Sequence, residues 1–506
     1  MKKLALFCLL AMASISLFGQ SYNVIRENIV KAQLAPYLAA GQIESADGHL
    51  YLYYTDNTVW SSSKPVFDVL YSISLEDYSV SEIQLQHLNS YNFVTMYEDG
   101  DNIYALYSEW QNKTKTYTMY MNAIEKNSNQ AKWHPQEIIS VTTEKRDGLY
   151  LQHAVSPDNS KMAFCLLAAS KKNDFKGSVA KAFGEGGEQI WENNLDFNFA
   201  NKTFTVMDFM VDNEGVAYAA ICSYDNATRT SREDETLHFV VMTDDNTLSV
   251  DERIDFGYLS SSVMKMLKNG KVALGGYYHE ELTKNEAGSY MAIFDPKREE
   301  ISVDKMEFPK DYYAEKAMLG IPAASHYATR AQFVEEYEDG SLLLLGEMRT
   351  MIAYTDNRGM TTYKYFARNI PVVYADANGK INDFAVIKKN QYASSGTPQN
   401  TLWLRGQGFS YMPVMHNNKV YLFYCDAMEN YLGKSGLLSK PSYAPAHATA
   451  YCTIVPGQPI ETKAILNGKT DKYRMIIPLL VEDDFVLGIG TNKKKMAEIV
   501  KVNHSF

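Results

Sequence analysis

Tight polar turns, each followed at once by a run of apolar and aromatic residues, recur eight times along the chain. Consecutive turns begin 52 to 78 residues apart. The turns are Asp47-Gly48, Asp99-Gly100, Asp158-Asn159, Asn213-Glu214-Gly215, Asn269-Gly270, Asp339-Gly340, Asn417-Asn418 and Asp483-Asp484. Repeats of this length, made of strands separated by turns, are typical of a radial array of small sheets. The sequence therefore predicts an all-β protein, a β-propeller of eight blades, or of seven if one turn belongs to an insertion.

Each repeat has room for a meander of four antiparallel strands, A to D. In the fourth repeat the expected strands are Phe204–Val211, Val216–Cys222, Leu237–Met242 and Leu248–Phe256, with a loop over Ser223–Glu235 between the second and third. Short strands of period two, separated by Gly, Asn and Asp turns, favour such hairpins.

The last repeat has room for only three strands, Tyr473–Leu480, Phe485–Ile489 and Met496–Val502. Near the other end of the chain, Tyr22–Val30 has a strand-like pattern and no place in the first repeat. This segment is expected to supply the missing outer strand of the last blade, because such pairing would remove two open sheet edges.

The first 20 residues have the pattern of a secretory signal. Lys2 and Lys3 precede an apolar stretch, Leu4–Phe18, and small or polar residues follow. No cysteine stands directly after that stretch, as lipid attachment would require. We therefore expect a cleaved signal and a periplasmic or extracellular protein in which residues 21–506 form a single propeller domain. No later window has ~20 uninterrupted apolar residues, so membrane insertion is not expected.

Charge and cysteine content narrow the partners and the redox chemistry. The chain has 60 acidic and 49 basic residues, a net charge of −11. Nucleic acids and anionic membranes both need a basic footprint, so neither is an expected partner. Beyond the signal lie Cys165, Cys222, Cys425 and Cys452. The last two are expected on neighbouring strands, where a disulfide is geometrically possible; four buried free thiols are the favoured alternative.

The expected connections between strands differ in length. The A–B and C–D connections are short turns, whereas the long segments are all B–C or D–A connections. In a four-stranded meander the A–B and C–D connections lie at one end of the sheet, and the B–C and D–A connections lie at the other. One end is therefore loop-rich, and binding usually takes place on elaborated loops that a rigid scaffold holds.

Aromatic and cationic residues are frequent in these long connections. Ring faces suit sugars or peptides, and guanidinium groups suit carboxylates. The segment Glu347–Phe366 is expected to form an extended hairpin that turns at Asp356–Gly359 and carries Tyr354, Tyr363 and Tyr365 beyond its blade. The predicted ligand-binding residues are Trp403, Arg405, Tyr363, Tyr365, Arg349, Arg330, His326 and Tyr312. The alternative is that these aromatic side chains pack the inserted loops against each other.

Motifs of common catalytic and cofactor sites are missing from the sequence. It has no HExxH, CxxC or GxSxG motif and no Walker or dinucleotide fingerprint after a strand. The sequence therefore indicates neither a metal site nor a particular cofactor. Asp426, Glu429, Asp311 or Glu315 could supply paired carboxylates for glycoside hydrolysis, provided that two of them lie ~5–5.5 or ~6.5–9.5 Å apart.

Several short stretches of the sequence resemble patterns of known protein families. Ser156-Pro157-Asp158-Asn159 resembles the SPDG-type turn of TolB-like repeats. The stretch from Gly187 to Trp191 resembles the Gly-x-x-x-Trp corner of PQQ-type repeats, although the tryptophan does not recur. A pattern of uncharacterised secreted proteins of Bacteroidota is similar to Asn369–Val373, Asn378-Gly379-Lys380, Lys389-Asn390-Gln391, Asn417–Tyr421 and the pair Asp426 and Asn430. The resemblances imply a propeller and a bacterial lineage, and no activity.

The sequence favours a non-catalytic propeller whose loop-rich side binds a protein, a peptide or a glycan. A polysaccharide-active hydrolase or lyase, with acidic residues in the central funnel, is one alternative. An outer-membrane assembly scaffold is another. A deep polar pocket with two close carboxylates beside an arginine or tyrosine would favour the enzyme, and an aromatic surface without such a pocket would favour binding.

Overall fold

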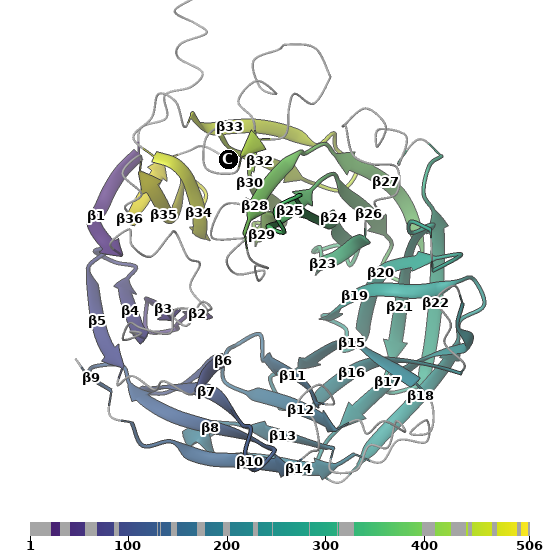
Figure 1. Cartoon of the computed structure of the whole chain (residues 1–506), viewed down its shortest axis with the longest axis horizontal. Helices are drawn as coiled ribbons and strands as arrows, with labels where there is room; N and C mark the ends of the chain where they lie inside the picture. The colour runs from purple at the N-terminus through teal and green to yellow at the C-terminus, as the bar shows by residue number, and fades with distance from the viewer. Residues whose placement is uncertain are drawn as a thin grey trace, which may run out of the picture. The chain divides into compact units, whose positions relative to one another are not determined.

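The computed structural model describes residues 22–30, 41–55, 68–85, 91–128, 130–131, 133–142, 149–168, 178–195, 203–225, 231–244, 246–282, 284–310, 312, 328–396, 410–426, 442–443, 448–467, 473–492 and 497–503. Contacts divide the chain into two compact units. The first unit consists of Ala39–Phe308 and Ala375–Ile381, and the second of Met1–Leu38, Pro309–Tyr374 and Asn382–Phe506. The described secondary structure is almost wholly β in both units (Figure 1).

The first unit contains five antiparallel sheets in chain order. Sheet 1 is β2 (Gly41–Glu44), β3 (His49–Thr55), β4 (Asp68–Ser74) and β5 (Val80–Leu85), with β9 (Gln130–Ala131) added in parallel; sheet 2 is β6 (Asn92–Asp99), β7 (Asn102–Gln111), β8 (Thr116–Glu125) and β10 (Gln136–Thr142); sheet 3 is β11 (Leu149–Val155), β12 (Met162–Ala168), β13 (Val179–Phe183) and β14 (Gln189–Asn194), with the short helix η2 (Glu185–Gly187); sheet 4 is β15 (Thr203–Val211), β16 (Ala217–Asp225), β17 (Glu233–Met242) and β18 (Thr247–Arg253); sheet 5 is β19 (Tyr258–Met266), β20 (Val272–His279), β21 (Gly288–Asp295) and β22 (Glu300–Glu307).

The second unit contains three sheets. Sheet 6 is β23 (Ala328–Glu336), β24 (Leu342–Thr355), β25 (Thr361–Ala367), β26 (Ile370–Ala375), β27 (Ile381–Ile387), β28 (Gln391–Ser395) and β31 (Ser442–Tyr443); sheet 7 is β29 (Tyr411–His416), β30 (Lys419–Asp426), β32 (Ala448–Ile454) and β33 (Glu461–Asn467); sheet 8 is β34 (Tyr473–Val481), β35 (Phe485–Asn492), β36 (Ala497–Asn503) and β1 (Tyr22–Val30).

Eight antiparallel sheets built on four-stranded meanders are the blades of a β-propeller, so the predicted fold class and the favoured blade count are confirmed. The predicted completion of the last blade is confirmed as well. Strand β1 pairs antiparallel with β36, from Tyr22 opposite Val502 to Val30 opposite Ala497. That residues 21–506 form a single domain stays a prediction from the sequence.

The eight polar turns have the backbone that hairpins of this kind need. Every one except Asp483-Asp484 contains a residue with positive φ, such as Gly48 at 78° and Asn159 at 62°. Glycine and asparagine tolerate this left-handed region, which other residues seldom adopt. The Oδ1 atom of Asp339 accepts a hydrogen bond from the backbone N–H of Ser341 at 2.9 Å, which closes the turn. The turn residues therefore set where each hairpin reverses.

In the fourth repeat the second and third strands run further into their connection than expected, whereas the fourth, β18, ends at Arg253 instead of Phe256. The ladder between β16 and β17 continues to Asp225 opposite Glu233, so the predicted loop over Ser223–Glu235 is wrong at both ends. The backbone pairing extends past the apolar run because polar side chains near a sheet end do not interrupt the ladder. Residues 226–230 lie outside the described part of the chain.

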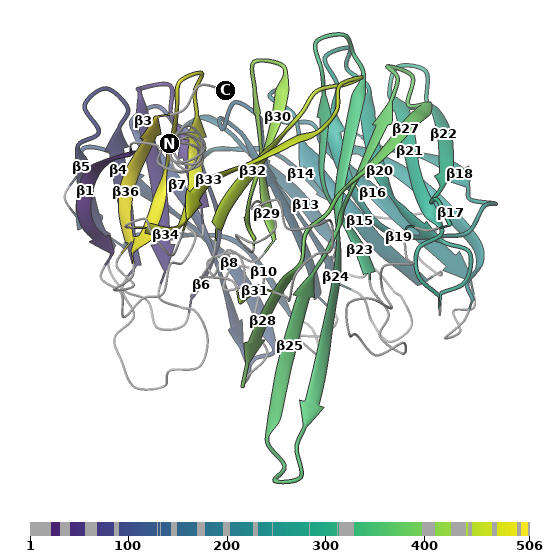
Figure 2. The ribbon, with the colours of Figure 1, turned by 90° about the horizontal axis from the view of Figure 1, so that it is seen from above.

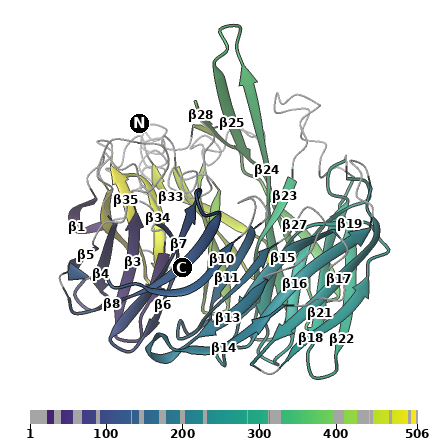
Figure 3. The same ribbon diagram turned by 60° about the horizontal axis from the view of Figure 1, so that its bottom comes forward.

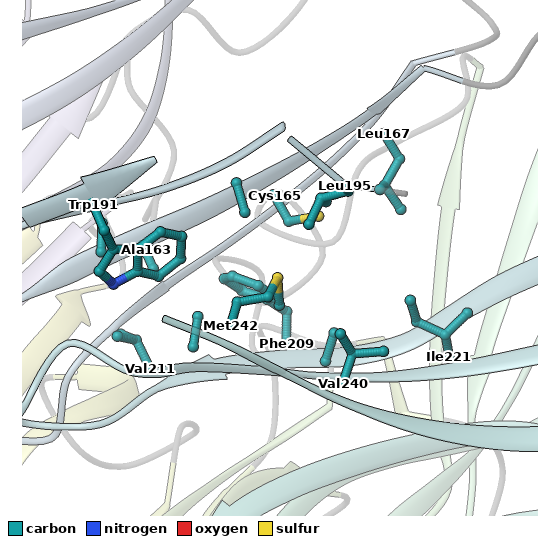
Figure 4. Packing of buried hydrophobic residues seen from close by; sticks show 14 residues of the cluster. Ala163, Cys165, Leu167, Trp191, Leu195, Phe209, Val211, Ile221, Val240 and Met242 are labelled. Carbon is teal, nitrogen blue, oxygen red and sulfur yellow. The ribbon is translucent and has the colours of Figure 1, made fainter. Parts of the chain in front are cut away.

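The core lies between the faces of consecutive sheets. Strand β16 is buried on both faces: Ala217, Ala219 and Ile221 pack toward sheet 3, whereas Tyr218 and Cys222 pack toward sheet 5. Trp191, Phe209 and Met242 belong to the cluster between sheets 3 and 4, and Figure 4 shows Met242 beside Phe209 and Trp191 near Ala163. Continuous apolar runs after the turns therefore indicate strands that are covered on both sides.

The four cysteines beyond the expected signal are free and buried. Cys425 lies opposite Thr449, and Cys452 lies opposite Leu422. The favoured reading of four buried thiols is therefore confirmed. Burial raises the pKa of Cys425 to about 12, which leaves its thiol protonated and unreactive at neutral pH.

Candidate functional site

A long hairpin, which we call the arm (residues 350–366), extends from sheet 6. Its strands β24 and β25 run beyond the other strands of their sheet (Figures 2 and 3). Their pairing continues from Arg349 opposite Ala367 to Thr355 opposite Thr361. The predicted extended hairpin over Glu347–Phe366 is therefore confirmed, and it is the connection between strands B and C of its blade.

The tip of the arm is closed by one carboxylate. The Oδ1 atom of Asp356 accepts hydrogen bonds from the backbone N–H groups of Arg358 at 2.8 Å and Met360 at 2.9 Å. Gly359 supplies the left-handed conformation, with φ at 77°. The tip is thus a defined turn at the predicted place, and it holds the two strands in register.

The arm carries most of the large apolar side chains that the described residues expose. Met351, Tyr354 and Met360 are 53%, 58% and 67% exposed, and the other two such residues are Tyr150 and Ile190. Exposed apolar side chains gathered on one element mark interaction surfaces in soluble proteins. The arm is therefore the strongest candidate for a contact surface in the second unit.

A buried ionic network anchors the base of the arm. Glu347, with a fully buried side chain, accepts hydrogen bonds from Lys389 and Arg349, which both form ion pairs with it. Arg349 also donates to the Oγ atom of Ser410 at 2.6 Å, and this hydroxyl donates to Glu347 at 2.8 Å. The network ties the residues of β24 directly before the arm to Ser410, which directly precedes β29.

Gln391 links this network to the next sheet of the unit. Its Oε1 atom accepts from Lys389 at 2.8 Å and from the backbone N–H of Ser410 at 2.7 Å, while its Nε2 atom donates to the carbonyl of Cys425 at 2.7 Å. Ser410 has φ at 87°, a strained conformation for a residue other than glycine. Strain of this kind persists because the surrounding hydrogen bonds hold the residue in place.

The charges of the network determine the protonation of Glu347. Burial opposes ionisation of this carboxyl, but the attraction of Lys389 and Arg349 outweighs it and lowers the pKa of Glu347 to about 2. Burial also lowers the pKa of Lys389 below its usual value, against the attraction of Glu347. The carboxylate of Glu347 is thus ionised at neutral pH, and it forms ion pairs with Lys389 and Arg349.

The predicted ligand-binding residues fall into three groups. Trp403, Arg405 and His326 lie outside the described residues. Tyr363 and Tyr365 lie on β25, where Tyr365 is buried against Ala367 and Ala393. Arg330 is exposed on β23, Arg349 is half-buried in the network, and Tyr312 is buried with its ring against Phe384. The arm therefore unites Tyr363 and Tyr365, and the binding role of all eight residues stays a prediction.

The first unit has a pocket of about 540 Å³ where B–C and D–A connections emerge. Arg232, directly before β17, donates to buried Glu235 at 3.2 Å and to the carbonyl of Leu259 at 3.2 Å, and its guanidinium lies over the ring of Tyr224. The residues that line the pocket are Arg232, Asp234, Glu235, Arg253, Ile254, Asp255, Phe256, Gly257, Tyr258 and Glu280. Each of its two guanidinium groups has a carboxylate partner, so the pocket offers no surplus positive charge.

A serine, a histidine and an aspartate line up across sheet 4. The Oγ atom of Ser223 lies 2.7 Å from Nε2 of His238, and Nδ1 of His238 lies 2.6 Å from Oδ1 of Asp251. These are the contacts of a hydrolytic triad. Ser223 is, however, completely buried, so no substrate reaches its Oγ atom. The arrangement satisfies both nitrogens of a buried histidine, and it stabilises the sheet.

The described residues hold no group of three or more histidine, cysteine, aspartate and glutamate side chains that could bind a metal ion. Of the four carboxylates considered for glycoside hydrolysis, Asp426 is described, and it is buried at the end of β30. Asp311, Glu315 and Glu429 lie outside the described residues. In the described part of the chain, no helix is long and apolar enough to cross a membrane.

Glu347, Lys389, Gln391, Ser223, His238 and Asp251 were not among the predicted site residues. The signal for the ionic network is weak, because a lysine between two strands usually indicates an exposed loop. The signal for the Ser–His–Asp line lies only in the strand register, which pairs His238 with Asp251 and Ile221. Ser223 comes two residues after Ile221 and therefore shares its face.

No protein-family model matches the chain, and no curated protein matches it. Among solved structures, a polysaccharide lyase described as a PL25 ulvan lyase is similar at 9% identity, covering 88% of this chain and 96% of its own, with a TM-score of 0.38. The propeller domain of the Trilobed protease from Pyrococcus furiosus has 9% identity, coverages of 73% and 98%, and a TM-score of 0.34. The WD40 domain of SCAP from fission yeast has 10% identity, coverages of 96% and 94%, and a TM-score of 0.33. The fold of this chain rests on its own eight sheets, and likenesses this distant carry nothing about activity.

Proposed function

We propose that this protein is a non-catalytic binding scaffold that holds a protein partner through the arm. The exposure of Met351, Tyr354 and Met360 on this one element carries the proposal. Tyrosine and methionine are enriched at protein interfaces. Tyrosine buries a large area at a small entropic cost, and the flexible methionine side chain adapts to the shape of a partner. Among the partners that the sequence allows, a protein or peptide suits this surface better than a glycan.

The anchoring network supports the same reading. A hairpin that projects into solvent can bind with specificity only if its base is fixed, since a mobile arm would lose conformational freedom on binding. Glu347, Lys389 and Arg349 provide this fixed base. We further propose a periplasmic or extracellular location, which follows from the expected signal over residues 1–20. Sequencing the N-terminus of the protein exported by its native host tests that location.

The arm can be shortened without changing the rest of sheet 6. Ala353 and Tyr363 lie opposite each other, so residues 354–362, which include Tyr354 and Met360, can be replaced by Asn-Gly, which suits a two-residue hairpin turn. This replacement keeps every residue of β25 that pairs with β28. Immobilised wild-type and short-arm proteins are then exposed to an extract of the native host and cross-linked. We expect a protein that is enriched at least about tenfold by the wild type relative to the short arm. The proposal would be refuted if both proteins captured the same host proteins equally, or if both bound a glycan array equally well.

A further inference from the structure

One edge of the arm is open among the described residues, and it has no charged residue. Arg349 pairs with Ala328 of β23 and with Ala367 of β25, so these two strands lie on opposite sides of β24. Among the described residues, the pairing with β23 ends at Ala328 opposite Arg349, whereas β24 continues to Thr355. In the described part of the chain, Met351–Thr355 therefore has a strand partner on one side only.

The other edge of the arm shows what such an edge can accept. Strand β25 pairs on its outer side with β28, from Tyr363 opposite Ser395 to Ala367 opposite Gln391. The chain thus covers one edge of the arm with a strand of its own. Proteins protect open edges with lysine, proline or bulges, because unpaired N–H and C=O groups template a further strand. The segment Thr350–Thr355 contains no lysine and no proline.

We infer that the arms of two copies of this protein pair as antiparallel strands along Met351–Thr355. The inference rests on the proposed function and names the partner. Each copy has a net charge of −11, so two copies repel each other wherever acidic surfaces meet. The uncharged edge avoids that repulsion, and it lies on a hairpin that extends beyond the other strands of its sheet (Figure 2).

The edge is also self-complementary. Around a two-fold axis perpendicular to the sheet, Ala353 faces Ala353 of the second copy. Ile352 then faces Tyr354 of the second copy, twice, which is a favourable pairing of a β-branched with an aromatic side chain. Met351 faces Thr355 of the second copy. A strand pair of this length buries less than the ~1,200 Å² of a standard interface, so the dimer forms reversibly and depends on concentration.

Cysteine cross-linking tests the register directly. The four cysteines beyond the expected signal are buried, so in Ala353→Cys the new thiol is the accessible one among the described residues. Residues facing each other across antiparallel strands have Cβ atoms ~4.5–5.5 Å apart, close enough for a disulfide after a small adjustment. We expect mild oxidation at micromolar concentration to give a covalent dimer of Ala353→Cys, at least about tenfold faster than of the tip variant Asn357→Cys. Adding Tyr354→Lys to Ala353→Cys should abolish this difference.

Each of the other possible outcomes would contradict the pairing itself, its register or the identity of the partner. If Ala353→Cys stays monomeric while its thiol reacts freely with a small reagent, or if Asn357→Cys cross-links equally fast, the pairing does not occur. A faster dimer of Ile352→Cys would refute the stated register. If the Ala353→Cys thiol is instead protected by a different protein from a host extract, the second copy is the wrong partner and the proposed function stands.

Discussion

Lys389 and Glu347 form an ion pair in which neither side chain is exposed to solvent. The pair lies where the arm leaves sheet 6, and Arg349 and Ser410 complete it. Removing two charges from water costs several kcal/mol each, and this cost is offset only when partners are well placed on every side. The pair is therefore best understood as a device that fixes the base of the arm.

Removing one partner should destabilise the second unit strongly. Lys389→Met leaves the buried carboxylate of Glu347 with Arg349 as its remaining cation, and the expected loss is about 3 kcal/mol or more in the free energy of unfolding. Replacing both residues, with Glu347→Leu added, should recover part of the loss, because the two fully buried charges are then both gone, while Arg349, which loses its ion pair with Glu347, is partly exposed to solvent. Urea denaturation of the single and double variants measures both effects.

An exposed pair provides the matched control. Arg253 and Asp234 are 2.9 Å apart, but their side chains are 76% and 59% exposed. Exposed pairs contribute about 0–1 kcal/mol, so Arg253→Met should have little effect on stability. If Arg253→Met and Lys389→Met cost the same, burial does not govern the contribution of these pairs.

The loss of folding stability at acid pH should depend on Glu347. Its pKa is lowered from 4.5 to about 2 in the folded protein, so the unfolded chain binds the proton more readily. The stability that this carboxylate contributes is present above pH 4.5 and is lost as the pH falls from 4.5 toward 2. Unfolding free energies measured across this window should fall more steeply for the wild type than for Glu347→Gln. Parallel curves would contradict the assignment.

Ionisation of Asp208 should change the stability with pH in the opposite direction. Its carboxylate accepts hydrogen bonds from the backbone N–H groups of Met264 at 2.6 Å and Phe209 at 2.9 Å, but burial outweighs them and raises its pKa to about 6. The folded state therefore binds this proton more readily than the unfolded state, whose value is near 3.8. The contribution is present below pH 3.8 and is lost as the pH rises through 6. Between these values, Asp208→Asn should show a flatter loss of stability with rising pH than the wild type.

The Ser223–His238–Asp251 line should be structural. Fluorophosphonate probes, which label activated serines, are expected to leave the protein unmodified because Ser223 is completely buried. His238→Phe should cost about 1–3 kcal/mol of stability, since it leaves the buried hydroxyl of Ser223 without its partner. Covalent labelling of Ser223 by the probe would reverse this assignment and favour the hydrolase alternative.

The fold could be predicted because its signals are local. Turn residues such as Gly48 and Asn159 require a left-handed backbone, and their spacing shows one blade after another. The outer strand Tyr22–Val30 could be assigned because the last repeat lacked a strand, and an unpaired edge is costly. The arm could be predicted because Asp356–Gly359 is a local turn signal between two strand-like runs.

The candidate site was harder to predict because its signals are not local. Nothing in the neighbourhood of Lys389 shows that its side chain is buried, since the partners that neutralise it are 42 residues away at Glu347. The alignment of His238 with Asp251 depends on strand register, and a shift of one residue would place them on opposite faces. Long-range pairing of this kind is visible in the structure alone.

Trp191 links sheet 3 to the turn of sheet 4, and its replacement should show how much that link contributes. Its Nε1–H donates to the carbonyl of Gly215 at 2.8 Å, and its ring is buried in the cluster between the two sheets (Figure 4). Trp191→Phe keeps most of the apolar area but leaves the carbonyl without this donor, so we expect a loss of about 1–3 kcal/mol. Trp191→Ala should cost about 3–5 kcal/mol, because it also opens a cavity. The matched control is Trp110→Phe, whose Nε1–H bonds to the nearby side chain of Asn112 and which should change stability by less than about 0.5 kcal/mol. Equal losses for the two phenylalanine variants in urea denaturation would show that the bond to Gly215 does not couple the sheets.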